Sequence, residues 1–512
     1  MNTTRNLGRR AFLGCTGALA GLAGSMEALA AADKPGARPK NIIWMVADGM
    51  SPSQLPLADQ LSLLVRDRGI LWQKLLTRRD VAHGCMDMAS LDSPVTDSSS
   101  ASSSWGSGSR IFNGWVNVLP DGTKLTPLAA IAHDRKKRVG LVTTTTVTHA
   151  TPAGFAASER NRDDEALIAA QYLRNVDVVL GGGRRFFEAA TRPDHTDLAA
   201  RFREQGFACA MSRDELLKLK GTKMLGLFAA SHLPYTVDRN ADAQLQRDVP
   251  TLAEMTGAAL ASLASSPDGF LLQVEAGRVD HGAHASDAAA ALWDQLAFDD
   301  AIATVLRFAE HHPETLVVLT SDHGNSNPGL VGMGREYTGS RQCFARLPLI
   351  KTSFYEAMRE WGVKAEYSMS PGTAQQSAPR LTPEQLRDAV HARFGFDMAA
   401  REVEALHASL GGGKQWSLNP QLDAPVGVLG QIVGNHTGIY WTGSTHTSDY
   451  TLITALGPGS GRFNGFIRNT DVFPALVGAM GSSFRNPAMP AAKAMKFQEA
   501  AQAAPRLRPH WV

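Results

Sequence analysis

The stretch NIIWMVADGMS, Asn41 to Ser51, joins a continuous apolar run, residues 42–46, to an aspartate at position 48. Four more runs of the same kind follow, at residues 139–143, 178–180, 270–274 and 316–319. Amphipathic helical patterns lie between most of them, including residues 164–174, 252–264 and 287–309. Continuous apolar strands that alternate with such helices are typical of a mostly parallel sheet covered on both faces. The sequence therefore predicts an α/β fold with a large central sheet.

The composition limits the class of protein. The chain has 512 residues, of which 44% are hydrophobic and 20% are charged, values typical of a soluble globular protein. A formal net charge of +2 provides no basic field for nucleic acid and no acidic tail. Apart from Cys15, the cysteines are Cys85, Cys209 and Cys343, which allow at most one disulfide and form no metal-binding Cys-x-x-Cys pair.

The first thirty residues resemble an export signal. Arg9 and Arg10 form a twin-arginine pair, a weakly apolar run covers residues 15–30, and Ala28-Leu29-Ala30 matches an A-x-A cleavage site. We expect the twin-arginine export machinery to carry the chain to the periplasm or outside the cell, with cleavage of this signal. The alternative is an uncleaved membrane anchor, but the run is short, rich in Gly and Ala, and interrupted by Glu27.

Acidic and imidazole side chains follow three of the predicted strands. They are Asp48 after residues 42–46; Glu275, Asp280, His281 and His284 after residues 270–274; and Asp322 and His323 after residues 316–319. Ligand sites in open α/β sheets lie beyond the carboxyl ends of the strands, so these side chains should meet at one edge. A single aspartate there is usually a helix cap or a turn residue, but acids that converge repel one another without a cation. The pattern predicts metal binding, with Asp and His favouring zinc and oxygen-only ligands favouring magnesium.

The stretch VTDSSSASSSWGSGSR, Val95 to Arg110, has eight serines in sixteen residues. Composition alone favours a flexible linker, because Ser/Gly tracts bury little surface. The other possibility is that one serine differs chemically from the rest.

Together these motifs resemble the alkaline phosphatase family. The elements are NIIWMVADGMS; VTDSSSASSSWGSG with FNG after it; THATPAG with a downstream NR; VEAGRVDHGAH; LTSDHGN; and STHTSDY, all in the family order. The resemblance covers residues 41–330 and resumes over about 438–481. It implies a three-layer α/β/α fold with an inserted segment, hydrolysis of phosphomonoesters with two zinc ions and one magnesium ion, and a homodimer.

The resemblance singles out one serine. In the family the nucleophilic serine directly follows an aspartate and precedes a tryptophan by seven residues, and Asp97, Ser98 and Trp105 fit that register. Ser98 would therefore carry a covalent phosphoserine, and the linker interpretation is set aside. The serines after it would be small residues at the start of a helix, which leave room for a phosphate and donate backbone N–H groups to it.

The resemblance also implies the metal ligands. One zinc ion would be bound by Asp48, Asp322 and His323 and would stabilise the serine alkoxide. The other, bound by Asp280, His284 and His446, would stabilise the leaving oxygen and activate a water. A magnesium ion would take Glu275, Thr151 and the far side of Asp48. His436 competes with His446, because His436-Thr437-Gly438 also resembles a family motif.

Three further residues are expected around the phosphate. Arg162 fits the family's phosphate-binding arginine, with Arg160 as the competing choice. His149 and His281 stand where the best-known bacterial relatives carry Asp and Lys. His149 should make the third site bind magnesium less tightly and let zinc compete for it, and His281 should hold phosphate less strongly than a lysine. The alternative is that both histidines only fill space beside the site.

The chain is divided accordingly. Residues 1–30 are interpreted as the signal peptide, 41–330 and 437–482 as the catalytic domain, 331–436 as a partly helical insertion, and 483–512 as a C-terminal tail. In the insertion, Thr382-Pro383-Glu384-Gln385 predicts a capped helix start, and a second helix over 398–410 should end at Gly411-Gly412-Gly413. The insertion rests on the core beside the site or at a dimer interface, or it is a surface elaboration. The run Gly181-Gly182-Gly183 lacks the Lys-Ser/Thr of a phosphate-binding loop and is interpreted as a turn.

The sequence thus favours a periplasmic enzyme that hydrolyses small phosphomonoesters and releases inorganic phosphate. A phosphodiesterase of the same superfamily is the first alternative, although its third metal site is typically absent and Glu275 and Thr151 argue against it. A sulfatase would need Cys or Ser in C/S-x-P-x-R, a spacing that Cys343-Phe344-Ala345-Arg346 lacks. The alternative from another class of protein is a non-catalytic zinc- or phosphate-binding protein. Such a protein would not need Ser98, Arg162 and the whole ligand set, so their presence argues against it.

Overall fold

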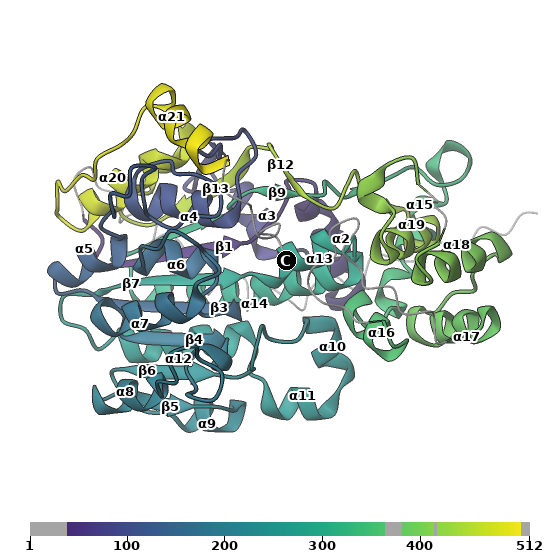
Figure 1. The fold of residues 1–512 in the computed structure, drawn as a ribbon, viewed down its shortest axis with the longest axis horizontal. Helices are drawn as coiled ribbons and strands as arrows, with labels where there is room; N and C mark the ends of the chain where they lie inside the picture. Colours follow the sequence, from purple (N-terminus) through teal and green to yellow (C-terminus); the bar gives the residue numbers. More distant parts are fainter. Residues whose placement is uncertain (1–37, 364–380, 414–416, 503–512) are drawn as a thin grey trace, which may run out of the picture.

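A ten-stranded sheet forms the centre of the computed structural model, which describes residues 38–363, 381–413 and 417–502 (Figure 1). The order across the sheet is β14-β2-β13-β8-β1-β7-β3-β4-β6-β5. The strands are β1 (Asn41–Ala47), β2 (Ala82–Asp87), β3 (Arg138–Thr146), β4 (Val178–Gly182), β5 (Ala208–Ala210), β6 (Met224–Leu227), β7 (Phe270–Ala276), β8 (Thr315–Thr320), β13 (Thr451–Leu456) and β14 (Gly465–Arg468). Only β13 runs antiparallel to its neighbours, β2 and β8. The mostly parallel sheet predicted from the sequence is confirmed.

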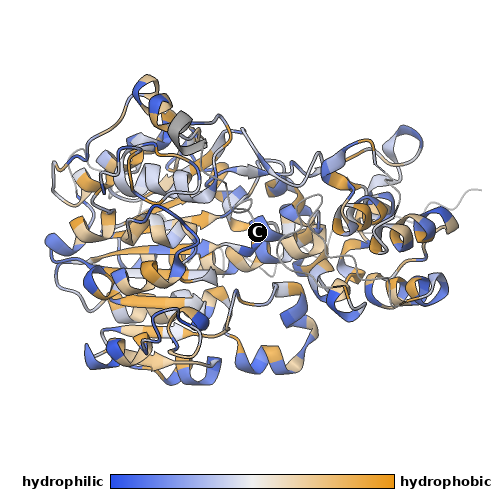
Figure 2. Cartoon of the chain, in the orientation of Figure 1, coloured by the Kyte–Doolittle hydropathy of each residue, from blue (hydrophilic) through white to orange (hydrophobic). Residues whose placement is uncertain are grey.

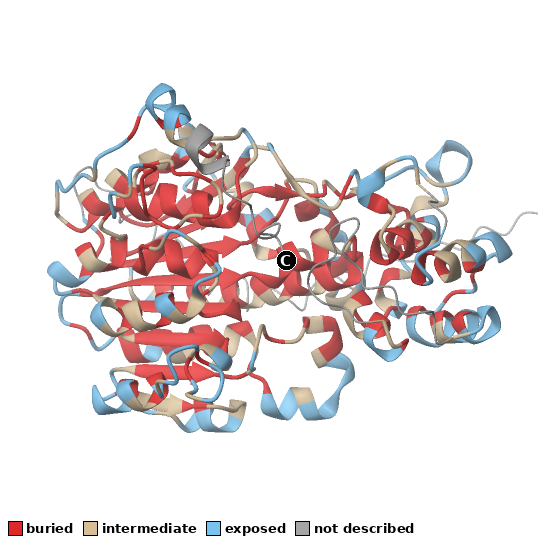
Figure 3. Ribbon diagram, viewed as in Figure 1, coloured by how far each residue is buried: buried red, intermediate tan, exposed pale blue. Residues whose placement is uncertain are grey.

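Side chains of β1 alternate between two apolar cores, one on each face of the sheet. Ile43 and Met45 join one core, while Ile42 and Trp44 join the other. The first core is covered by helices that include α2 (Gln54–Arg66), α3 (Leu71–Leu76), α12 (Leu252–Leu263) and α14 (Ala288–His311). The second is covered by α4 (Ser98–Ser107), α5 (Leu128–Asp134), α6 (Ala150–Ala156), α7 (Glu165–Asn175), α8 (Leu198–Glu204) and α20 (Asn469–Ala479). The result is the predicted three-layer α/β/α fold, with apolar, buried strands between the helices (Figures 2 and 3).

All five strands predicted from apolar runs are present. Four other strands of the sheet, β2, β5, β6 and β14, have no comparable run of large apolar residues. Strand β2 reads AHGCMD and is only partly buried, so it lacks a continuous apolar run. Strands β5, β6 and β14 have three or four residues each. Strands of three or four residues are too short for a clear pattern, even where they are buried, as β6 is.

The interpretation of Gly181-Gly182-Gly183 as a turn is only partly right. Gly181 and Gly182 continue β4, and only Gly183, with φ +91°, makes the turn. A Cβ on Gly182 would lie 2.1 Å from the carbonyl oxygen of Ser231. These glycines therefore allow another backbone segment to pass close to the end of β4.

The segment 331–436 extends beyond one end of the sheet (right in Figure 1). Its helices are α15 (Ser340–Phe344), α16 (Phe354–Glu360), α17 (Pro383–Phe394), α18 (Ala400–Leu410) and α19 (Pro425–Thr437). The predicted capping box at Thr382 and Gln385 is present, and α18 ends next to Gly411. Buried apolar residues of this segment belong to the same core as α2 and α14. The segment therefore packs on the catalytic core.

Within the part of the chain that the structure describes, five further α-helices and two short strand pairs lie outside the elements described so far. They are helices α9 (Arg213–Lys218), α10 (Thr236–Ala241), α11 (Ala243–Asp248), α13 (Arg278–His284) and α21 (Ala491–Gln502), and the short strand pairs β9 (Gly324–Asn325) with β12 (His446–Thr447) and β10 (Gly329–Leu330) with β11 (Ile439–Tyr440). Over the described residues, no helix combines the length and apolarity needed to span a bilayer. Cys85, Cys209 and Cys343 are free thiols. The predicted signal peptide, residues 1–30, lies outside the described residues.

Helices α4 and α6 meet at a close backbone contact that should be sensitive to any added atom. A Cβ on Gly106 would lie 2.0 Å from the carbonyl oxygen of Gly154. We expect Gly106→Ala to lower stability by roughly 1–3 kcal/mol, because the helices must separate to admit the methyl group. Gly257→Ala is the control, since that helical position meets nothing closer than 3.8 Å and gains helix propensity. Urea unfolding checks both variants; an equally stable Gly106→Ala would show that the helix contact is adaptable.

Candidate active site

The serine-rich stretch forms a buried helix, so the linker interpretation is wrong. Helix α4 begins at Ser98, and all ten of its residues are buried. Asp97 caps it by accepting a hydrogen bond from the Ser100 backbone N–H at 2.8 Å. Later serines donate to carbonyl oxygens, for example Ser104 to Ser100 at 2.9 Å. The serine side chains are small, and several of their hydroxyl groups donate to carbonyl oxygens of the same helix. A serine-rich helix can therefore pack tightly against α6.

The three strands that end in ligands are neighbours in the sheet. β1 lies between β8 and β7, so Asp48 stands between Asp322 of one strand end and Glu275 of the other. Three groups of side chains bring potential ligand atoms within 4.8 Å of one another: Asp48, Asp322 and His323; Asp280, His284 and His446; and Asp48, His149 and Glu275. The central strand thus contributes to two of the three groups.

Ser98 faces the first of these groups. Its Oγ lies 3.1 Å from Nε2 of His323, and the same nitrogen lies 3.1 Å from Oδ2 of Asp322. In the second group, Nε2 of His284 lies 3.0 Å from Nε2 of His446 and 3.2 Å from Oδ2 of Asp280. Nitrogen and oxygen atoms from separate elements therefore converge around two small spaces beside the serine.

Burial and like charge oppose ionisation of these acids. Burial, and then the charge of Asp322, raises the pKa of Asp48 well above its usual value. Burial likewise raises the pKa of Glu275 to about 7. A bound cation stabilises the folded protein most where buried carboxylates repel one another, as they do here.

Several buried polar atoms in these groups have no hydrogen-bond partner in the structure. They are both carboxylate oxygens of Asp48, Oε1 of Glu275, Oγ1 of Thr151, Oδ2 of Asp322 and Nδ1 of His323. Buried polar atoms are nearly always paired, so such a cluster fits coordination of metal ions. The first two groups combine nitrogen and oxygen ligands, as zinc prefers, and Glu275, Thr151 and Asp48 offer oxygen to a harder ion.

Arg162 lies in the cavity with Ser98, whereas Arg160 does not. The Arg162 guanidinium is buried and donates to Oδ2 of Asp97 at 3.0 Å and to Nε2 of His149 at 3.1 Å. Arg160 is exposed and lies over the ring of Trp115. The structure thus offers only Arg162, of these two, for a phosphate on Ser98.

His446 and His436 also occupy different surroundings. His446 belongs to the group of Asp280 and His284, and its Nδ1 lies 2.8 Å from the carbonyl oxygen of Thr96. His436 instead lies 3.1 Å from a carboxylate oxygen of Glu402 and stacks on Phe396. Of the two histidines weighed from the sequence, the one placed with the other ligand atoms is His446.

His149 and His281 form a wall of the cavity together with His232. Ring centroids of His149 and His281 lie 5.5 Å apart, and those of His232 and His281 lie 4.6 Å apart. Burial, and then the charge of Arg162, lowers the pKa of His149 to about 3. Because Arg162 donates to Nε2 of His149, the proton of the neutral ring lies on Nδ1 in this orientation. A ring nitrogen of His149 lies with Asp48 and Glu275 in the third group of potential ligand atoms, and its Nδ1 makes no hydrogen bond in the structure.

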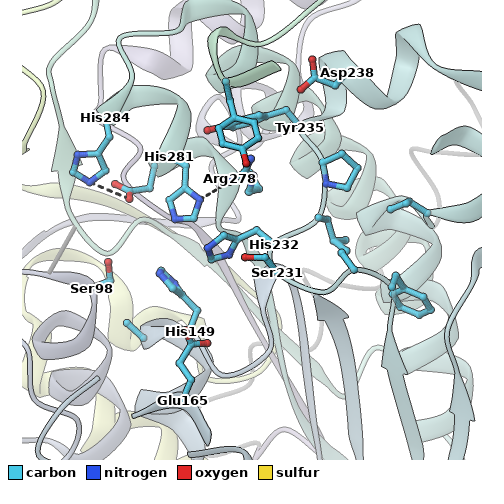
Figure 4. A pocket seen from close by; sticks show the side chains of 18 of the residues that line it. Ser98, His149, Glu165, Ser231, His232, Tyr235, Asp238, Arg278, His281 and His284 are labelled. Atoms are coloured by element: carbon cyan, nitrogen blue, oxygen red, sulfur yellow. Dashed lines mark hydrogen bonds and ion pairs between the residues drawn. The ribbon is translucent and has the colours of Figure 1, made fainter. Parts of the chain in front are cut away.

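Part of the cavity lining has no recognisable motif in the sequence. His232 and Tyr235 belong to SHLPY, which matches no motif of the resemblance. Arg278 could have been found, because it stands in VEAGRVDHGAH two residues before Asp280. The cavity that contains Ser98 has a volume of about 620 Å³ and extends past these residues (Figure 4).

Comparison with known proteins agrees with this arrangement. The family model for alkaline phosphatase matches residues 39–481, including the segment 331–436. Alkaline phosphatase 3 of Bacillus subtilis (strain 168) is 28% identical over 449 residues, 85% of this chain and 87% of the relative. The crystal structure of Thermus thermophilus alkaline phosphatase is 34% identical with a TM-score of 0.83, over 96% of this chain and all of that one. The cold-active enzyme of a Shewanella species follows, at 25% identity and a TM-score of 0.69 over 86% of this chain and 99% of that one.

The fold and the matched residues define a phosphomonoester hydrolase of the α/β/α type. The chain belongs to the alkaline phosphatase family. The family and the enzyme class predicted from the sequence are confirmed.

The two candidate histidines can be separated by mutation. We expect His446→Ala to weaken retention of zinc strongly, because removing one of three protein ligands leaves an open site. His436→Ala should leave zinc content unchanged, since its ring lies beside Glu402. Metal content after dialysis, measured by mass spectrometry, checks both variants. Loss of zinc from His436→Ala and not from His446→Ala would reverse the assignment.

Proposed function

We propose that the enzyme hydrolyses phosphomonoesters through a covalent phosphoserine on Ser98. The Ser98 oxygen forms a bond to phosphorus while the ester P–O bond breaks and the alcohol leaves with a proton. A water molecule then breaks the bond between phosphorus and Ser98 and releases inorganic phosphate. The observation that carries this proposal is the position of Ser98, at the first residue of α4 with its Oγ 3.1 Å from Nε2 of His323 in the first ligand group.

Residues of the chain itself bind and orient the phosphoryl group. Asp97 accepts from the N–H of Ser100, so the N–H groups of Ser98 and Ser99 at the start of α4 would serve an anion on Ser98, where the helix dipole favours negative charge. Arg162 offers a planar fork of donors, held in place by Asp97, for two phosphoryl oxygens. His281 stands on the opposite wall, where burial and the charge of Arg278 lower its pKa well below the usual value. A neutral His281 would hold phosphate by a hydrogen bond and would therefore release it more readily than a lysine.

Metal ions would complete the site. We propose zinc at Asp48, Asp322 and His323 and at Asp280, His284 and His446, and magnesium at Glu275, Thr151 and Asp48 with His149 beside it. When bound, such ions supply Lewis acidity that lowers the pKa of hydroxyl groups and water and stabilises developing negative charge. The unpaired buried oxygens described above support this assignment.

The proposed setting is the periplasm or the exterior, reached by twin-arginine export, with the enzyme acting as a homodimer on small phosphomonoesters. The twin-arginine pair and the cleavage site in the first thirty residues support export. The catalytic domain would comprise residues 41–330 and 437–482, with 331–436 as an insertion.

Substrate comparison separates this function from its alternatives. We expect metal-loaded enzyme to hydrolyse p-nitrophenyl phosphate much faster than bis-p-nitrophenyl phosphate or p-nitrophenyl sulfate, and to lose activity to a chelator until zinc and magnesium are restored. A faster diester reaction would favour a phosphodiesterase. Absence of all three activities in loaded protein would favour a non-catalytic phosphate- or zinc-binding protein.

The covalent step has its own test. Ser98→Ala should lower turnover by several orders of magnitude and abolish trapping of radiolabelled phosphate at acid pH, because the hydroxyl that forms the ester is gone. Ser100→Ala is the matched control, since Oγ of Ser100 donates to the carbonyl of Ile111 and not toward the ligand groups. Peptide mapping of the trapped label checks the assignment, and label on another serine would contradict it.

A further inference from the structure

The cavity is larger than a phosphate group requires. Its catalytic end contains Ser98, Arg162 and ligands of the second metal group. The other end is lined by parts of residues 228–249 and by Tyr355 and Glu356 of α16, none of which belongs to a catalytic motif (Figure 4). A volume of about 620 Å³ therefore provides a defined space for the alcohol part of the substrate, which is the leaving group.

The wall between the two ends presents hydrogen-bond donors. Arg278 is 3% exposed, and its Nη1 donates to Nδ1 of His281 at 2.8 Å. The backbone N–H of Thr146 donates to Nδ1 of His232 at 3.1 Å. A neutral imidazole that accepts at Nδ1 carries its proton on Nε2. Both histidines are therefore donors at Nε2, and Arg278 is a donor with a permanent positive charge.

Two arginines outside the catalytic motifs' phosphate site lie at this wall. The guanidinium of Arg278 lies over the ring of Tyr235, 3.6 Å from its centroid, and Arg185 lines the same cavity. Burial comes first among the causes that hold the pKa of His232 well below its usual value, and His281, Arg278 and Arg185 add to it. Arg278 and Arg185 therefore lie near enough to His232 to act on its charge, and both line the cavity.

Carboxylates that line the cavity are already engaged by donors of its wall. Glu165 accepts from the hydroxyl groups of Thr146 and Thr148 at 2.5 and 2.6 Å. Asp238 accepts from the backbone N–H of Ser353 at 2.7 Å. Glu356 accepts from Arg359 at 2.7 Å, Asp280 belongs to a metal group, and the charge of Asp163 acts on Arg162. These contacts orient the carboxylates, and Arg278, whose charge also acts on Asp238 and Asp294, is together with Arg185 a positive charge of the lining near His232.

The distal end is also held rigidly. Asp294 accepts from the backbone N–H of Thr236 at 2.9 Å, next to Tyr235, and Asp287 accepts from that of Phe354 at 2.6 Å, next to Tyr355. Asp294 lies within the long helix α14, and Asp287 is the N-cap residue of the same helix. Donors on a rigid support lose little entropy when a ligand binds.

We propose that the cavity end lined by His232, Arg278 and Arg185 is a subsite for a second phosphate group on the leaving group. This inference rests on the proposed function of Ser98. The enzyme would then favour small bisphosphates over monophosphates of the same skeleton, at the spacing that lets one phosphate reach Ser98 while the other meets Arg278. Tyr235, Tyr355 and the apolar residues nearby contact the carbon skeleton between them.

A series of synthetic substrates of increasing chain length tests the subsite. The probes are straight-chain α,ω-alkanediol bisphosphates of increasing length, each compared with the ω-hydroxyalkyl monophosphate of the same length. We expect kcat/KM for the bisphosphate to exceed that of its monophosphate by roughly tenfold at one length, the size of one charge-assisted hydrogen bond, beyond the statistical factor of about two for two reactive groups. The ratio should fall back toward that statistical factor in Arg278→Gln and in Arg185→Gln.

Arg184→Gln is the matched control, because Arg184 lies beside Arg185 in sequence, pairs with Glu188 and does not line the cavity. Its bisphosphate ratio should equal that of the parent enzyme. If Arg278→Gln fails to fold, Arg185→Gln alone decides. A ratio near two at every length, or one that neither arginine changes, would overturn the subsite. Lack of turnover of the monophosphates would instead refute the proposed function.

A second, independent observation concerns the chain after the family match. Residues 482–497, named here the C-terminal strap, follow the matched region, which ends at residue 481. Asn486 donates to the carbonyl oxygens of Ser107 at 3.0 Å and Thr126 at 2.8 Å, and it accepts from the N–H of Thr126 at 2.9 Å. Ser109 donates to the carbonyl of Pro487 at 2.7 Å. The strap therefore holds the end of α4, the helix that begins at Ser98.

The strap also packs on the loop after α4. Met489 and Ala494 share a small apolar core with Ile111, Phe112, Leu119 and Leu125. This loop reaches the phosphate-binding residues directly. Asn113 accepts from the N–H of Asp97, the N–H of Gly114 donates to the Asp97 carboxylate, and the carbonyl of Gly114 accepts from the N–H of Arg162, each at 2.9 Å.

We infer that Asn486 and the C-terminal strap position Asp97 and Arg162 for phosphate through this loop. Asn486→Ala and Ser109→Ala should each raise the inhibition constant of inorganic phosphate, by roughly fivefold for Asn486→Ala, because the Arg162 fork is less well held. Asn464→Ala is the control, since it removes a similar side-chain bond, to the N–H of His83, away from this loop. A strap that only stabilises the fold would lower the melting temperature and the active fraction without changing phosphate inhibition, and that result in both variants would refute the inference.

Discussion

Mutual repulsion of buried carboxylates at the edge of the sheet is the constraint on which the rest of the structure depends. Asp48 is completely buried, and its two oxygens lack donors. Two unit charges about 4 Å apart repel by roughly 4 kcal/mol at an effective dielectric constant near 20. Several such pairs are comparable with the whole stability of a domain, about 5–15 kcal/mol. The proposed cations would remove this conflict, and folding and metal binding would then be linked.

Sheet order explains why this constraint falls on Asp48. Its strand, β1, lies between β7 and β8, so the ends of three parallel strands meet around one side chain. Because parallel strands end at the same edge, this convergence could be predicted from the apolar runs and the acids that follow them. The fold class, the five central strands and the helix start at Thr382 were predictable for the same reason, since each has a local pattern.

Other features have no local pattern. Strand β2 is half exposed and reads AHGCMD, so only its pairing with β13 and β14 makes it a strand. The serine-rich stretch has a linker's composition, and only the register of Asp97 and Trp105 within a family resemblance distinguishes it. His232 shows the limit most clearly. It joins His149 and His281 through a turn that follows β6, and nothing in SHLPY indicates which strand end lies beside it.

The two ends of the cavity are subject to different physical demands. At the catalytic end, ligand atoms must converge within a few ångströms, so the residue types are fixed and the sequence signal is strong. At the distal end, a leaving group needs only a shaped wall with donors of suitable charge, which many sequences can provide. Residues 228–249 and α16 supply that wall. Asp294 of α14 anchors Thr236 to the core, and Asp238 links residues 228–249 to Ser353 at the start of α16. The strand ends thus carry the residues proposed for the chemistry, and residues 228–249 with α16 shape the space proposed for the leaving group.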